Sequence, residues 1–165
     1  MLFISKEEYE GFNIYELEET TSTNDVLKSQ SDLSSSIVIL AQNQTHGRGR
    51  RSNVWQSASG NLYFSYNQYI NLQDLSKIVC LIALTLAQTI KQLSQNIDVK
   101  IKWPNDVIVN GGKISGILLE NIKDNIWCIG IGVNITSSPK LDNAPYPITS
   151  LQEEGIILDR KEFLH

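Results

Sequence analysis

The sequence contains little cysteine, no segment typical of a secretion signal and no long uninterrupted hydrophobic run. Its two cysteines, Cys80 and Cys128, lie far apart in apolar runs without CxxC spacing, so we expect buried, reduced thiols. The first ten residues, MLFISKEEYE, have no basic start, which argues against a signal peptide. The longest uncharged run, residues 78–90, is shorter than the ~20 residues that a membrane span needs. These absences predict a cytoplasmic protein that does not bind membranes.

Positive charge is also scarce, with 14 Lys and Arg against 18 Asp and Glu and a pI of about 5.2. This balance argues against a general nucleic-acid surface. Three arginines, Arg48, Arg50 and Arg51, nevertheless lie within GRGRR at residues 47–51. Arginine binds phosphate and carboxylate through paired hydrogen bonds, and glycine lets the backbone approach a ligand closely. We predict that this loop binds a small anion, such as nucleotide phosphates or an acyl-adenylate; a nucleic-acid patch and a solvated loop are the alternatives.

The 165 residues suffice for one domain with a single core, and they contain no repeats. Hydrophobic periodicity predicts strands from about residue 14 and at 34–44, 61–70, 99–103 and 126–135, and two strands within 106–120 around a Gly111-Gly112 turn. Predicted helices run from the TSTND segment to about residue 31, over 72–95 and from residue 159, and residues 136–150 form a loop. This order predicts an α+β fold: a mixed, largely antiparallel sheet with helices packed on it.

Lys113 follows the predicted hairpin turn, so the hairpin holds its ammonium group in a fixed place. Asn105 and Asp106 form a polar corner one strand earlier, and Gly116 leaves the surface beside Lys113 open. A solvated lysine on a hairpin is the alternative interpretation.

The segment CIGIGVN places Cys128, Gly130, Gly132 and Asn134 on one face of a strand. Two glycines on one face sacrifice packing, which indicates close approach by a ligand or by another backbone. We therefore predict that a flat base lies over the glycines with Asn134 at its end; tight strand–helix packing is the alternative.

The segment TSTND offers hydroxyl and amide groups near a helix N-terminus, at Ser22, Thr23 and Asn24. Helix capping alone would explain these residue types. They are also suited to bind a neutral polar head group, to which Gln44 would add another amide.

Six motifs, in this order, resemble those of biotin protein ligases. They are STN at 22–24, GRGRR at 47–51 followed by a Trp, GNLY at 60–63, KWPND at 102–106, KISGILLE at 113–120 and GIGVN at 130–134. The resemblance covers nearly the whole chain. It implies that residues 1–165 form the catalytic domain of this family, a biotin/lipoate protein ligase fold similar to class II aminoacyl-tRNA synthetases.

The resemblance implies that ATP, Mg²⁺ and biotin give biotinyl-5′-AMP, whose biotin passes to a lysine of a biotin carboxyl carrier protein. Lys113 would contact the biotin carboxylate and the α-phosphate, with Arg48 and Arg50 as further catalytic cations. The resemblance also implies that biotin is bound by Ser22, Thr23, Asn24 and Gln44. A loop that closes over the ligands would consist of Gly47, Arg48, Gly49, Arg50 and Arg51, with Trp55 packed on it. Asn105, Asp106 and Asn134 would contact the nucleotide, Asp106 would bind the metal, and Gly116 would leave open space.

Three departures from the family pattern bear on this expectation. Ser52-Asn53 replaces the common Gly-Arg, which removes one guanidinium that helps to bind the triphosphate. No winged helix precedes the domain, so we expect no DNA binding. The chain ends at His165, before the small C-terminal β-barrel domain that helps with ATP and carrier binding.

Rival interpretations are a lipoate ligase or octanoyltransferase, whose families lack GRGRR and KWPND, and a catalytically impaired biotin or adenylate binder of the same fold. A nucleic-acid-binding module is a third, which the acidic pI disfavours. The sequence leaves monomer and homodimer open.

Overall fold

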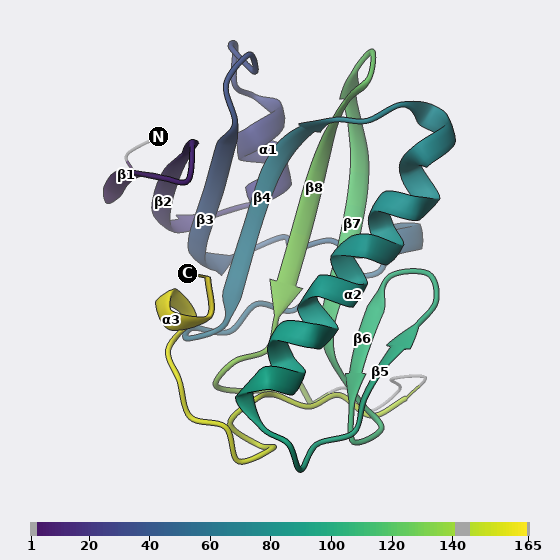
Figure 1. The fold of residues 1–165 in the computed structure, drawn as a ribbon. Coiled ribbons are helices and arrows are strands. Elements are labelled where there is room, and N and C mark those ends of the chain that lie inside the picture. The colour runs from purple at the N-terminus through teal and green to yellow at the C-terminus, as the bar shows by residue number, and fades with distance from the viewer. Residues whose placement is uncertain (1–2, 141–145, 165) are drawn as a thin grey trace.

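One eight-stranded sheet organises the computed structural model, which describes residues 3–140 and 146–164 (Figure 1). Its strands are β1 (Ser5–Tyr9), β2 (Phe12–Thr20), β3 (Ile37–Gln44), β4 (Leu62–Tyr69), β5 (Val99–Lys102), β6 (Asp106–Val109), β7 (Gly112–Lys123) and β8 (Ile126–Val133). The helices are α1 (Thr23–Lys28), α2 (Leu75–Leu93) and α3 (Arg160–Leu164), with 3-10 turns η1 (Arg50–Ser52) and η2 (Leu72–Asp74). The strand order is β1-β2-β3-β4-β8-β7-β6-β5. Among the strands of the described residues only β2 and β3 pair in parallel, so the predicted mixed, largely antiparallel sheet is confirmed.

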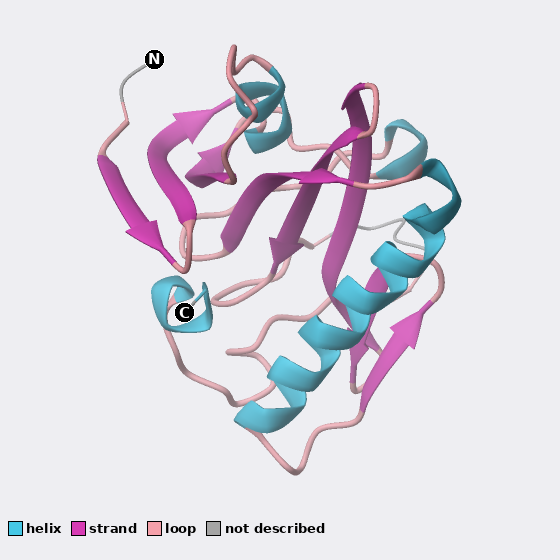
Figure 2. Cartoon of the chain, turned by 45° about the horizontal axis from the view of Figure 1, so that its top comes forward, coloured by secondary structure: helices cyan, strands magenta, loops and turns pink. Residues whose placement is uncertain are grey.

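The two faces of the sheet carry different helices. Helix α2 lies over β5, β6 and β7, and it covers the larger apolar cluster, which includes Ile90, Ile114 and Ile129 (Figure 2). Helix α1 packs on the opposite side against β3, β4 and β8, where Val26, Leu27 and other apolar side chains form a second cluster. Beyond α1, this second face carries the cavity described below.

Helix α2 is long and apolar enough to cross a membrane by length and composition alone, counted over Leu72–Leu93. Such a helix is weak evidence of a span, because core helices share these features. Ala83, Leu86, Ala87 and Ile90 of α2 are buried in the larger cluster. The helix therefore serves as one layer of the core.

The turn of the β6–β7 hairpin is shifted by one residue from the expectation. Asn110 and Gly111, with φ of 47° and 88°, form the turn, and Val109 pairs with Gly112, which is already in β7. Both turn residues are thus in the left-handed region that a two-residue hairpin turn requires, and Asn tolerates it better than most residues. The prediction of a Gly111-Gly112 turn was wrong by this one position.

Other differences concern the ends of elements. Strand β1 was not expected, because all five of its side chains are exposed and no buried alternation marks it. Helix α1 ends at Lys28 rather than near residue 31, and the first three residues of the predicted long helix form η2. Residues 141–145 of the predicted 136–150 loop lie outside the described part of the chain.

Candidate functional site

A cavity of about 470 Å³ opens on the α1 side of the sheet, beyond the helix. Its walls come from the loop before and after η1, the start of α1, the corner between β5 and β6, and the middle of β7 and β8. The lining residues that the sequence singled out as site candidates are Ser22, Thr23, Asn24, Gln44, Arg48, Gly49, Arg50, Arg51, Trp55, Asn105, Asp106, Lys113 and Gly116. The fold therefore brings together residues from four separate motifs, and Gln44 from the end of β3.

Glycines form the floor of this cavity. Gly116 on β7 and Gly132 on β8 are register partners, and the Trp55 side chain lies directly on them. A Cβ at Gly132 would come within 2.6 Å of the Trp55 ring, and one at Gly116 within 2.8 Å. At Gly130 a Cβ would collide with the side-chain amide of Asn24. The glycines permit close approach, and the groups that approach them in this structure are the side chains of Trp55 and Asn24.

Hydroxyl and amide groups gather at the α1 end of the cavity. Both the backbone N–H and the hydroxyl of Thr23 donate to Gln44 Oε1, at 2.9 and 3.2 Å. The Ser65 hydroxyl lies 2.7 Å from the Thr23 hydroxyl and 2.6 Å from Asn24 Oδ1. Ser22 occupies the N-cap position of α1, but its side chain makes no capping hydrogen bond. These polar groups therefore bind each other and face the cavity, and capping does not account for them.

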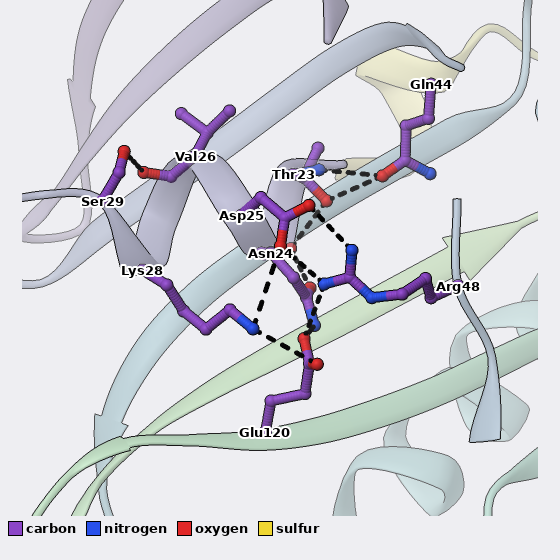
Figure 3. Close-up of polar contacts among 10 residues, drawn as sticks. Thr23, Asn24, Asp25, Val26, Lys28, Ser29, Gln44, Arg48 and Glu120 are labelled. Carbon is purple, nitrogen blue, oxygen red and sulfur yellow. Dashed lines mark hydrogen bonds and ion pairs between the residues drawn. The ribbon is translucent and has the colours of Figure 1, made fainter. Parts of the chain in front are cut away.

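The guanidinium of Arg48 is held by two carboxylates (Figure 3). It donates to both oxygens of Asp25, each at 2.7 Å, and to Glu120 Oε2 at 3.2 Å. The hydrogen bonds from Arg48 hold the pKa of Asp25 below its usual value, and the Arg48 pKa is raised in turn. Arg48 is thus ionised and already paired.

The rest of the arginine loop is stabilised by its own backbone. Gly49 N–H donates to the Asn53 carbonyl at 2.7 Å, and Trp55 N–H donates to the Gly47 carbonyl at 2.9 Å. Arg51 has a φ of 53°, in the left-handed region. The Arg50 guanidinium contacts a neutral group, Asn105 Oδ1, at 3.3 Å. Arg50 and Arg51 are exposed side chains at the mouth of the cavity.

Lys113 lies at the opposite end from α1, where its Nζ is 2.8 Å from Asp106 Oδ1. The Tyr146 hydroxyl donates to the other carboxylate oxygen, Oδ2, at 2.6 Å. Burial and the nearby Asp106 carboxylate raise the pKa of Tyr146 to about 12, so this hydroxyl stays protonated at neutral pH. Trp55 also flanks Lys113, with Nζ 5.4 Å from its ring centroid. The lysine is therefore fixed in place from several sides.

Two sequence candidates do not line the cavity. Gly47 lies under the loop, where a Cβ would clash with the Trp55 carbonyl. Asn134 is buried at the end of β8 and donates to the Thr149 carbonyl at 3.0 Å, while its Oδ1 has no hydrogen-bond partner among the described residues.

Several lining residues were not singled out from the sequence: Trp103, Pro104 and Tyr146. Trp103 is 77% exposed at the rim, and Lys102 Nζ lies 3.2 Å from the Tyr146 ring centroid. Trp103 and Pro104 belong to the KWPND motif, so their position could have been inferred from that motif. Tyr146 belongs to the loop before Ser150, and no local pattern marks it.

The described residues do not form a ready Mg²⁺ site. Asp106 is the one carboxylate lining the cavity within the described ranges, and its two oxygens face Lys113 and Tyr146. No group of three or more His, Cys, Asp or Glu side chains suited to a metal occurs in this part of the chain. Mg²⁺ commonly binds through one or two carboxylates together with substrate phosphates. The residues present fit an ion carried in with phosphates better than a resident one.

The model of the biotin/lipoate A/B protein ligase family matches residues 16–135. The biotin–[acetyl-CoA-carboxylase] ligase of Paracoccus denitrificans is 34% identical, over 90% of this chain and 67% of that protein. Biotin–protein ligase 1 of Arabidopsis thaliana is 32% identical, over 87% of this chain and 42% of that protein. The structure of the Aquifex aeolicus biotin protein ligase in complex with biotin and ATP matches with a TM-score of 0.80 at 31% identity, over 92% of this chain and 65% of that one. The chain thus spans between about two fifths and two thirds of these relatives.

Proposed function

The chain belongs to the biotin/lipoate A/B protein ligase family, and on this premise we propose that it activates biotin with ATP and transfers it to a carrier lysine. The observation that carries the proposal is the composition of one cavity. Neutral hydrogen-bonding groups of Thr23 and Gln44 line it together with the cations Lys113 and Arg50. A neutral, amide-like ring and two anions therefore have suitable partners within a single space.

In the first step, an oxygen of the biotin carboxylate attacks the α-phosphorus of ATP. The bond from this phosphorus to the oxygen bridging the α- and β-phosphates breaks, and pyrophosphate leaves with the electron pair. Carboxylate and phosphate repel each other as they meet. Lys113 and Arg50 offset this repulsion and stabilise the charge that builds up on the phosphoryl oxygens.

Asp106 and Tyr146 prepare Lys113 for this role. The ion pair with Asp106, whose other oxygen accepts from Tyr146, holds the ammonium in place beside the cavity before any substrate binds. Because an ammonium has three donors, Lys113 can keep Asp106 and still donate to a carboxylate and a phosphate oxygen.

In the second step, the neutral amine of the carrier lysine attacks the acyl carbon of biotinyl-5′-AMP. The bond from this carbon to the phosphate oxygen breaks, AMP leaves, and the amine nitrogen loses a proton. Water would destroy the same mixed anhydride. We propose that the loop at residues 47–55 covers the adenylate until the carrier arrives, with Arg50 and Arg51 as its outer cations.

Mg²⁺ belongs to this proposal as part of the ATP complex. The biotin carboxyl carrier protein as acceptor, a cytoplasmic location and a monomer or homodimer without nucleic-acid binding are likewise part of the proposal. The named relatives are biotin ligases, which favours this function over that of a lipoate ligase or octanoyltransferase. Experiment must distinguish this function from that of a protein that binds biotin without catalysing its transfer.

The test is to incubate the protein with biotin, ATP, Mg²⁺ and a carrier domain and to measure carrier mass. We expect one biotin on one carrier lysine. Arg50→Ala should still form biotinyl-5′-AMP, at a reduced rate, but release it into solution, whereas Lys100→Ala, at the exposed sheet edge, should behave like the wild type. Absence of product at high enzyme concentration, with biotin still bound, would identify a binder, and an Arg50→Ala variant that retains the adenylate would contradict the covering role.

A further inference from the structure

Arg48 differs from the other arginines of its loop because its charge is already balanced by carboxylates. Two acidic side chains, Asp25 and Glu120, and two basic ones, Arg48 and Lys28, form one network, in which Lys28 Nζ lies 3.3 Å from Glu120 Oε1 (Figure 3). These four charges cancel. The network therefore adds little net positive potential to the cavity.

Glu120 connects the arginine loop to the polar end of the cavity. Its Oε2 accepts a hydrogen bond from Asn24 Nδ2 at 2.6 Å as well as one from Arg48 at 3.2 Å. The other end of the Asn24 amide, Oδ1, accepts from Ser65 at 2.6 Å. With both ends engaged, the orientation of the Asn24 amide is fixed.

Three parts of the chain that are distant in sequence meet in this network. Asp25 and Asn24 lie on α1, Glu120 on β7, and Arg48 at the entry to the loop. Asp25 and Glu120 are both ionised, because the pKa of each is lowered. Hydrogen bonding to Arg48 lowers the pKa of Asp25. Burial would raise the pKa of Glu120, but the hydrogen bond from Asn24 and the charges of Arg48 and Lys28 lower it by more. The network is therefore intact at neutral pH.

We infer that Asp25 and Glu120 are positioning residues, which anchor Arg48 at the base of the loop and orient Asn24 before biotin binds. Arg48 is then an anchor, and the loop moves beyond it, at residues 49–53, where Arg50 and Arg51 provide the cations for the adenylate. The inference rests on the proposed function only in naming biotin and the adenylate. Its physical content is that the loop entry and the polar end of the cavity are ordered by one set of contacts.

Isolated surface ion pairs contribute little to stability, about 0–1 kcal/mol. The Asp25–Arg48 pair differs in geometry, since both carboxylate oxygens accept from the fork of the guanidinium. Each acidic side chain also restrains residues that line the cavity. Asp25 holds Arg48, and Glu120 holds both Arg48 and Asn24. Their loss should therefore be visible in the loop and in ligand binding more than in overall stability.

The experiment compares Asp25→Asn and Glu120→Gln with the wild type and with Asp74→Asn, which removes an ion pair to Lys77 whose two residues do not line the cavity. Limited trypsin digestion without ligand, read by mass spectrometry, measures cleavage after Arg48, Arg50 and Arg51. We expect cleavage there to be about tenfold faster in the two network variants, as for the loss of one charge-assisted hydrogen bond. Asp74→Asn should match the wild type.

Biotin affinity and steady-state kinetics provide a second, independent measurement. The network variants should bind biotin about tenfold more weakly and show a raised KM for biotin at nearly unchanged kcat, and Asp25→Glu should recover part of the loss. Wild-type cleavage rates and biotin affinity in both variants would overturn the inference. If a variant does not fold, Arg48→Lys, which keeps the charge but loses the fork, replaces it in both assays.

The two proposals can fail separately. A wild-type protein that does not bind biotin would refute the proposed function, and trypsin cleavage would still decide whether Asp25 and Glu120 anchor the loop.

Discussion

Arg48 and Arg50 are two residues apart in the chain, yet their guanidinium groups meet different partners. Arg48 is paired with Asp25 and Glu120, whereas the Arg50 guanidinium donates a hydrogen bond to the neutral amide of Asn105 and forms no ion pair within the described residues. Arg50 can thus turn to an incoming anion without breaking an ion pair. At the scale of single residues, this difference separates an anchoring cation from a substrate-facing one.

The two cysteines provide a test of burial at the same scale. Burial raises the pKa of the Cys128 thiol to about 12, while Cys80 is exposed on α2, contrary to the expectation that both thiols are buried. Because only the thiolate reacts and the raised pKa keeps Cys128 protonated at pH 8, we expect iodoacetamide to modify Cys80 alone in the native protein. Peptide mass spectrometry after a short incubation measures this.

Cys80→Ser should then abolish labelling of the native protein, and denaturation should restore it through Cys128. Rapid native labelling of Cys128 would show that β8 opens readily or that its thiol is not enclosed.

The sequence identified single residues by motif but not their partners. STN, GRGRR and KISG marked Asn24, Arg48 and Lys113, and all three line the cavity. The carboxylates that hold Arg48 lie 23 and 72 residues away in the chain, and only the pairing of strands and helices brings them together. Tyr146 could not be foreseen, because its role depends on where its loop crosses Asp106.

At the scale of elements, β7 and β8 give up side-chain packing to provide a flat surface. Ile129, Ile131 and Val133 of β8 face the α2 core, while Gly130 and Gly132 face the cavity. Trp55 lies on that surface with its indole N–H buried and without a partner in the described chain. A single methyl group on the strand would displace the ring.

Gly132→Ala should therefore destabilise the protein by about 1–3 kcal/mol, the usual cost of overpacking. Its Cβ would lie 2.6 Å from the Trp55 ring, so the clash is with this one side chain. The effect should largely disappear in a Trp55→Ala background, as a double-mutant cycle from urea unfolding would measure. An equal loss in both backgrounds would mean that the strand itself does not tolerate alanine.

The sequence predicted the elements better than their ends. Buried alternation located β4 and β8 to within about two residues of their ends, and the helical period located α2. The β6–β7 turn was placed one residue late because two glycines follow Asn110, and either pair satisfies the pattern. Edge strand β1 was missed because its side chains are exposed and show no buried alternation.

At the scale of the whole molecule, the sheet order decides where the site forms. Because β8 lies between β4 and β7, the Lys113 side chain, the glycines of β7 and β8 and the hydroxyl groups at the start of α1 lie on one face of the sheet. The sequence predicted the α+β class and a largely antiparallel sheet, but not this order, because strand pairing is set by contacts between distant segments. The motifs predicted which residues line the cavity, but its shape could be known only from the three-dimensional structure.

The proposed chemistry requires that Lys113 offset the charge of the two anions that must react. The most direct measurement is biotin-dependent exchange of labelled pyrophosphate into ATP, which reports the first step alone. We expect the wild type to exchange and Lys113→Ala to lose at least about 10²-fold of the rate, as expected for removal of one key electrostatic group, while still binding biotin. Exchange at the wild-type rate in Lys113→Ala would contradict the account.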